Sequence, residues 1–245
     1  NNRFYSNTIN GGNYGIVLRG FAASSPFTLA DTNNDVGGIA LATGNTILNY
    51  GGAAAATNPS AAIRIVDQWA ANVSFNTINN NNGSGVNHVS TLRGIITSGG
   101  TSASLNINNN GITLFGGGTT SQLDGISNGA GSTAAGNSIN INNNTLVLNY
   151  ASATGATING IVNSSSAATV NINGNNISAG SIIPGTGTHI LISGGSPVNL
   201  NISGNTINNF SRSSATTGTL RGIVITSPTT TVINNGSPSD IEHNA

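Results

Sequence analysis

The chain has 245 residues, of which 36% are hydrophobic and only 5% are charged, and its formal net charge is zero. A neutral surface offers no electrostatic attraction to nucleic acid or to an anionic membrane, so we expect neither partner. Cysteine is absent, which excludes a disulfide framework and thiolate metal sites, and no apolar run is long enough for membrane insertion.

The first predicted strands surround a three-residue word, Asn-any-(Ile or Leu), that returns along the whole chain. Apolar residues in alternation precede most copies, as Leu105 and Ile107 precede Asn110 and Ala40 and Ala42 precede Asn45. This alternation predicts a short strand with one face inward, followed by a tight turn and a second short strand. The words begin at intervals of 30 to 38 residues, at Asn7, Asn45, Asn76, Asn110, Asn144, Asn175 and Asn205.

A Gly-Ile pair between successive words predicts a third strand. The pairs are Gly15-Ile16, Gly38-Ile39, Gly94-Ile95, Gly125-Ile126, Gly160-Ile161 and Gly222-Ile223, while two further units keep only Ile63 and Ile190. Three short strands per unit, with no helical period between them, predict an all-β solenoid. We expect a right-handed parallel β-helix of about seven coils. Residues 1–245 then form a single segment, and we expect its parent protein to continue in both directions.

The repeated Asn residues suit a stack of coils. The same position in each coil lies about 4.8 Å above its predecessor, so a repeated charge would repel itself. One Asn amide both donates and accepts, so identical Asn side chains can bond to each other in a column. Asn also tolerates the left-handed backbone of a tight turn. We therefore expect the seven Asn residues to form a structural ladder at a turn.

Two strings carry a resemblance to a known family. They are V-N-I-N-G-N-N-I at 170–177 and L-N-I-S-G-N-T-I at 200–207, followed by R-G-I-V-I at 221–225. They resemble the parallel β-helix repeats of the pectate-lyase-like superfamily, over roughly residues 1 to 235. The style rich in Asn, Ser and Thr and free of Lys is similar to that of large secreted Bacteroidota proteins, including adhesins. The resemblance implies an extracellular or cell-surface location in a bacterium.

Carboxylates are too scattered to predict catalysis. Glycoside hydrolysis requires two acids on one face, whereas the acids are Asp31, Asp35, Asp67, Asp124, Asp240 and Glu242. We assign no catalytic residue. Arg93 and Asp124 each precede a Gly-Ile pair on neighbouring coils, which predicts an ion pair, and Arg64 with Asp67 would extend that row.

The three histidines, His88, His189 and His243, fall on different coils and lack partners at ligand spacing. We therefore expect no metal site and no cofactor.

Four aromatic residues follow a repeated Asn by five or six positions: Tyr50, Phe115, Tyr150 and Phe210. They are the candidate ligand-binding residues, because a row of rings can stack on sugars. The alternative is that the rings cover the hydrophobic corner of each coil.

These patterns favour a non-catalytic structural or adhesive module of a bacterial surface or secreted protein. Its partners would be glycans or other surface protein chains, contacted through loops 79–93, 113–124, 147–159 and 208–221. The alternative function is a glycan-active enzyme, either a polysaccharide lyase or a glycoside hydrolase, on the same scaffold.

Overall fold

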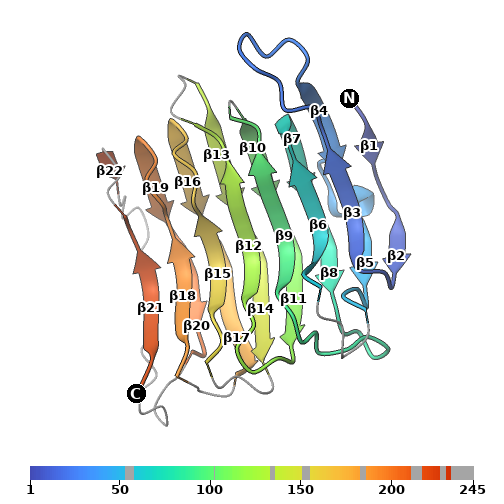
Figure 1. The fold of residues 1–245 in the computed structure, drawn as a ribbon, viewed down its shortest axis with the longest axis vertical. Helices are drawn as coiled ribbons and strands as arrows, with labels where there is room; N and C mark the ends of the chain where they lie inside the picture. Colours follow the sequence, from blue (N-terminus) through green and yellow to red (C-terminus); the bar gives the residue numbers. More distant parts are fainter. Residues whose placement is uncertain are drawn as a thin grey trace.

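The computed structural model describes residues 1–245 except 53–57, 102, 133–135, 151–154, 183–185, 211–216, 227–229 and 233–245. The described chain forms three parallel sheets, and each coil contributes one strand to each sheet (Figure 1). This arrangement confirms the predicted all-β solenoid with three short strands per coil.

The strands of each sheet are neighbours across successive coils. Sheet A contains β1 (Arg3–Phe4), β4 (Asp31–Val36), β7 (Gln68–Ser74), β10 (Ser104–Asn108), β13 (Ser138–Asn142), β16 (Thr169–Asn173), β19 (Asn199–Ser203) and β22 (Thr230–Val232). Sheet B contains β2 (Thr8–Asn10), β5 (Thr46–Leu48), β8 (Thr77–Asn79), β11 (Gly111–Gly116), β14 (Thr145–Tyr150), β17 (Asn176–Ile182) and β20 (Thr206–Asn208). Sheet C contains β3 (Tyr14–Arg19), β6 (Ser60–Val66), β9 (Leu92–Gly99), β12 (Leu123–Ala130), β15 (Ile158–Asn163), β18 (Thr188–Ser193) and β21 (Thr219–Val224).

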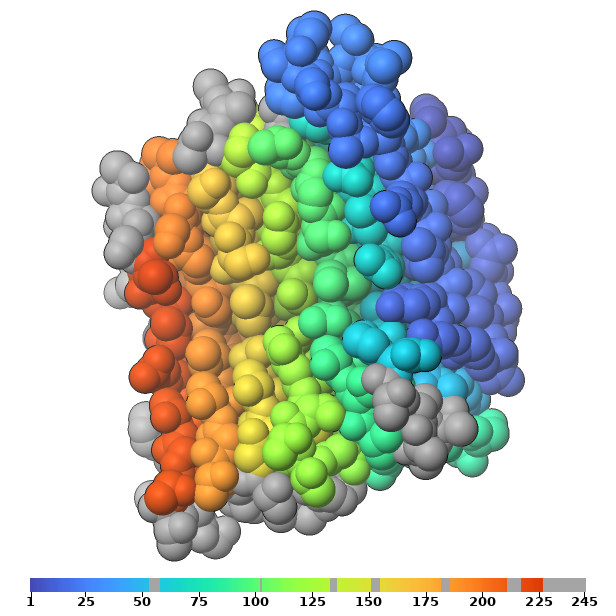
Figure 2. All heavy atoms as spheres, viewed as in Figure 1, coloured from blue at the N-terminus to red at the C-terminus, as the bar shows by residue number. Residues whose placement is uncertain are grey.

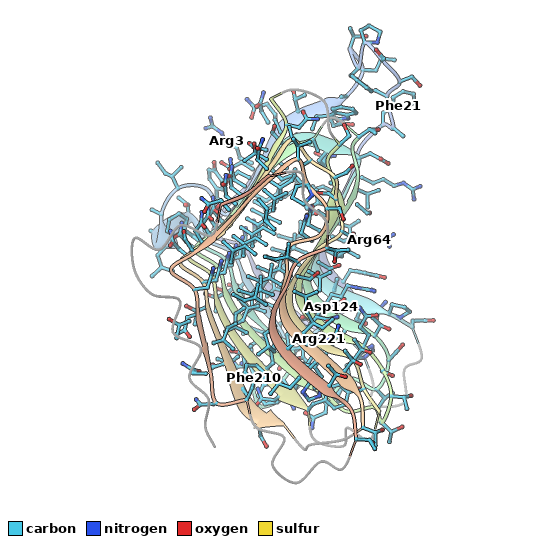
Figure 3. The ribbon with its side chains drawn as sticks, turned by 90° about the vertical axis from the view of Figure 1, so that its left-hand side faces the viewer. Arg3, Phe21, Arg64, Asp124, Phe210 and Arg221 are labelled. Atoms are coloured by element: carbon cyan, nitrogen blue, oxygen red, sulfur yellow. The ribbon has the colours of Figure 1, made fainter. Side chains whose placement is uncertain are left out.

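The coil is right-handed. In Figure 1 the chain climbs in sheet C at the front, crosses at the top and descends at the back through sheets A and B, while it advances to the left. Figure 3 views the stack from its C-terminal side, with Arg64, Asp124 and Arg221 of sheet C on one side and Phe210, after sheet B, on the other. Figure 2 shows the coils in chain order across sheet C, with the loop after β3 projecting above the stack.

The core consists of apolar columns that run along the stack. Sheet A places Val73, Ile107 and Ile141 in register, and all three are buried. Sheets B and C add comparable columns, such as Ile47 to Ile207 and Ile63 to Ile192. Because each residue of a column packs on the coils above and below it, the apolar area of one coil is buried by its neighbours.

The turn between sheets A and B differs in one detail from the expectation. At six of the seven turns the left-handed residue is the one before the repeated Asn, and the Asn itself adopts an ordinary conformation. The φ angles at these preceding positions are 53° at Ser6, 60° at Phe75, 57° at Asn109, 55° at Asn143, 64° at Gly174 and 60° at Gly204. The exception is Gly44, before Asn45, with a φ of −62°. Gly and Asn suit this conformation because they carry the smallest steric penalty for it.

The second coil contains an insertion, so its predicted register is wrong. Val36, at the end of β4, pairs with Phe4 and Val73, and residues 37–44 leave the coil before Asn45. The inserted segment includes the 3-10 helix η1 (Leu41–Thr43), and Ile39 is 88% exposed. Gly38-Ile39 is therefore not a strand start. No helix among the described residues is long and apolar enough to cross a membrane.

Candidate functional site

The seven repeated Asn residues, here called the ladder asparagines, form one continuous column between sheets A and B. The Nδ2 of each donates to the Oδ1 of the next, at 2.9 to 3.0 Å, from Asn7 through Asn45, Asn76, Asn110, Asn144, Asn175 and Asn205. All but Asn7 are buried. The structure confirms the predicted ladder.

Each interior ladder asparagine uses the whole hydrogen-bonding capacity of its amide. Asn144 Nδ2 donates to Asn175 Oδ1 at 3.0 Å and to the carbonyl of Ile107 at 2.8 Å. Its Oδ1 accepts from the backbone N–H and the Nδ2 of Asn110, both at 2.9 Å. Both N–H donors and both lone pairs of the amide oxygen are thus satisfied without water, so a buried amide is tolerated at this position.

A second buried polar column, which the sequence analysis missed, lies at the end of sheet C. Thr97 donates to Asn128 Oδ1, Asn128 Nδ2 donates to Asn163 Oδ1 at 2.7 Å, and Asn163 Nδ2 donates to the Gly194 carbonyl at 2.9 Å. All three side chains are buried. The signal in the sequence was an Asn three residues after the Gly of two successive Gly-Ile pairs.

From β7 to β19 the outer face of sheet A carries uncharged polar side chains in columns. Asn171 donates to Asn140 at 2.8 Å, and Asn140 donates to Asn106 at 2.9 Å. A parallel column contains Asn142 and Asn173, whose side-chain oxygens accept backbone N–H groups of the next coil. From coil to coil this face repeats amide and hydroxyl groups at the spacing of neighbouring strands.

The four candidate aromatic residues occupy different environments. Tyr50 and Tyr150 are fully buried, and their hydroxyls donate to the carbonyls of Arg93 and Ser121, both at 2.8 Å. Burial raises the pKa of both tyrosines. Phe210 is 9% exposed and belongs to the core. These three rings are buried, whereas Phe115, near the end of β11, is partly exposed.

Arg93 and Asp124 form the predicted ion pair. Arg93 Nε lies 3.1 Å from Asp124 Oδ2, and it is the only salt bridge among the residues that the structure describes. Asp124 is 1% exposed and also accepts from the side chains of Gln122 and Asn159, at 2.9 and 2.7 Å. This carboxylate is therefore held by several donors, which allows it to be buried while charged.

Arg64 and Asp67 do not extend that row. The Arg64 guanidinium carbon lies 5.7 Å from the centre of the Tyr14 ring, and Asp67 accepts the backbone N–H of Gly100 at 3.2 Å. Arg64, Tyr14 and Arg93 instead line a hollow of about 250 Å³ on the outer face of sheet C.

Asp31 and Asp35, which both lie in β4, are engaged separately. Asp31 accepts the backbone N–H of Phe21 at 2.8 Å. Asp35 accepts from the Tyr5 hydroxyl and from Asn72, at 2.7 Å for the latter. The hydrogen bond to Asp35 raises the pKa of Tyr5. Asp240, Glu242 and His243 lie outside the described residues.

The two histidines in the described part of the chain are both buried. His88 is buried, and its Nε2 lies 3.0 Å from the carbonyl of Asn58. Burial lowers its pKa below the usual value near 6.5. His189 is also buried, in β18. Within the described ranges no group of three or more His, Cys, Asp and Glu side chains is arranged to hold a metal ion.

The fold and its columns define the class of protein: a right-handed parallel β-helix with an internal asparagine ladder. Comparison of the chain with protein-family models, with curated proteins and with solved structures finds no match.

Proposed function

We propose that this chain is a non-catalytic structural or adhesive module of a secreted or surface-exposed bacterial protein. The observation that carries the proposal is the contrast between a uniform stack and variable loops. The ladder and the core columns repeat in every coil, whereas the connection from sheet B to sheet C changes from residues 11–13 in the first coil to residues 80–91 in the third. Loops of this kind vary without disturbing the stack, and such loops commonly carry binding.

The chemistry of the surface supports glycans or neighbouring protein chains as partners. The columns of Asn, Ser and Thr on sheet A present neutral donors and acceptors, which suit hydroxyl groups. Phe115 stands at the start of the 117–122 loop and offers a partly exposed ring. The repeats resemble pectate-lyase-like coils, which supports the same class of partner.

A glycan array and a hydrolase and lyase screen on the purified chain test this proposal. We expect binding without turnover, and we expect Phe115→Ala to weaken binding. Thr113→Ala is the matched control, because Thr113 faces outward from the same strand but lies farther from the loop. Turnover that disappears in Asp31→Asn or Asp124→Asn would contradict the proposal and favour the glycan-active enzyme.

A further inference from the structure

A hollow of about 250 Å³ opens on the outer face of sheet C, across the first three coils. The parallel register aligns Tyr14 with Ala61 and Ala61 with Arg93. A small side chain therefore lies between two large ones that are separated by two strand spacings, roughly 10 Å. The hollow exists because the middle coil carries alanine at this position.

Two of the six arginines of the chain line this hollow, although charged residues are rare in this protein. Arg93 is fixed by Asp124 through its Nε, and within the described ranges its terminal guanidinium nitrogens form no hydrogen bond. Arg64 lies over the ring of Tyr14 and, among the described residues, forms no salt bridge. None of the described residues that line the hollow is acidic. The two guanidinium groups are thus opposed only by the buried carboxylate of Asp124, so the local net charge is positive.

The remaining walls are suited to part of a sugar ring. Pro59 and Ile96 add apolar surface beside Ala61. Ser60 lies at the edge, where its hydroxyl already donates to Asn13 at 2.5 Å. An apolar wall next to guanidinium groups strengthens their attraction for an anion, because it excludes part of the screening water.

We propose that this hollow binds an oxyanion, the carboxylate or sulfate group of an acidic glycan, between Arg64 and Arg93. The planar guanidinium group matches both oxyanions through paired N–H donors. The ring that bears the group lies against Ala61, Pro59 and Ile96. This inference rests on the proposed adhesive function and adds a ligand class to it.

A largely neutral polymer with isolated acids fits this face better than a polyelectrolyte. On the neighbouring strands of sheet C, the position aligned with Arg64 and Ile96 is occupied by Ser127, Val162 and Ser193. Nucleic acid requires a row of cations along its backbone. The four arginines in the described strands of this sheet are scattered instead: Arg64 and Arg93 lie at the hollow, Arg19 ends β3, and Arg221 lies four strands from Arg93.

Binding to three forms of one polymer tests the inference: neutral dextran, carboxymethyl-dextran and dextran sulfate. We expect the chain to bind at least one charged form and not neutral dextran, with affinity that falls as salt is added. Arg64→Gln should weaken this binding about tenfold or more, since it removes charge-assisted hydrogen bonds. Arg64→Lys should restore part of it. Comparison of the two charged forms identifies the preferred oxyanion.

Arg221→Gln is the matched control, because Arg221 is exposed on the same sheet but four strands from Arg93 (Figure 3). It should bind as the wild type does. Arg64 is preferred to Arg93 for the test because removal of Arg93 would leave Asp124 buried without its cation. Thermal unfolding of each variant confirms that the fold is retained.

Equal binding by wild type and Arg64→Gln would overturn the inference, as would an equal loss in Arg221→Gln or equal binding of neutral dextran. Failure of the proposed function is a separate result. If Phe115→Ala abolishes binding to a neutral glycan while no charged dextran binds, the oxyanion site is wrong and the adhesive function stands.

Discussion

Replacing Asn175 with aspartate keeps the size of the side chain, removes its N–H donors and, at neutral pH, introduces a charge. Asn175 Nδ2 donates to the Ile141 carbonyl at 2.8 Å and to Asn205 Oδ1 at 2.9 Å, and the side chain is buried. A carboxylate would remove the donor to the Ile141 carbonyl and would leave Asn205 Oδ1 with only the backbone N–H of Asn175, at about 1 to 3 kcal/mol for each lost bond. We therefore expect Asn175→Asp to lower the free energy of unfolding by about 2 to 6 kcal/mol.

Asn173→Asp is the matched control two residues away. Asn173 is partly exposed, and its Oδ1 accepts from the backbone N–H and the hydroxyl of Ser203, at 2.9 and 2.8 Å. An aspartate oxygen accepts the same two bonds, so the change should stay within about 0.5 kcal/mol. Urea unfolding followed by far-UV circular dichroism measures both variants, since this signal reports every coil.

Acid should reduce the defect of Asn175→Asp. Burial disfavours the charged form, so the pKa of the new carboxyl rises in the folded state above its unfolded value of about 3.9. The penalty is therefore full at neutral pH and shrinks as pH falls through the raised pKa. Equal midpoint shifts for the two variants, or a defect of Asn175→Asp relative to wild type that does not change with pH, would refute this reasoning.

Three further predictions concern packing and protonation. Gly125→Ala should destabilise the fold by about 1 to 3 kcal/mol, because the new methyl group would meet a backbone oxygen of the next coil at 2.6 Å, whereas Gly111→Ala meets nothing within 4 Å and should be neutral in urea unfolding. Burial lowers the pKa of His88, so stability should decline as pH falls below about 6.5, and His88→Gln should remove that part of the decline in a pH series of melting temperatures. Tyr150→Phe should lower the free energy of unfolding in urea by about 1 kcal/mol, because the carbonyl of Ser121 loses its donor. An unchanged free energy would show that this hydrogen bond contributes nothing to stability.

The sequence predicted the features that are repeated in every coil. The ladder from Asn7 to Asn205 and the pairing of Arg93 with Asp124 both followed from register, because a parallel stack places equivalent positions next to each other. The Gly-Ile pairs also have a physical basis, since a side chain at Gly94 would approach a backbone oxygen of the next coil at 2.5 Å.

The sequence failed where a coil departs from the repeat. The alternation of Ala40 and Ala42 predicted a strand before Asn45. The strand in fact ends at Val36, and Ala40 and Ala42 lie in an exposed insertion. Burial of Tyr50 depends on the path of the chain after its strand, which periodicity does not encode. The hollow beside Ala61 likewise depends on side-chain size in three different coils.

The internal ladder has a direction. In all six links the amide nitrogen of the earlier coil donates to the amide oxygen of the later coil. The amide dipoles therefore add along the stack, as peptide dipoles do along a helix. An inverted coil would bring two nitrogens or two oxygens face to face. Such a chain can lengthen or shorten by whole coils in the same orientation, and a duplicated segment of 30 to 34 residues reproduces both the donor and the acceptor that its neighbours require.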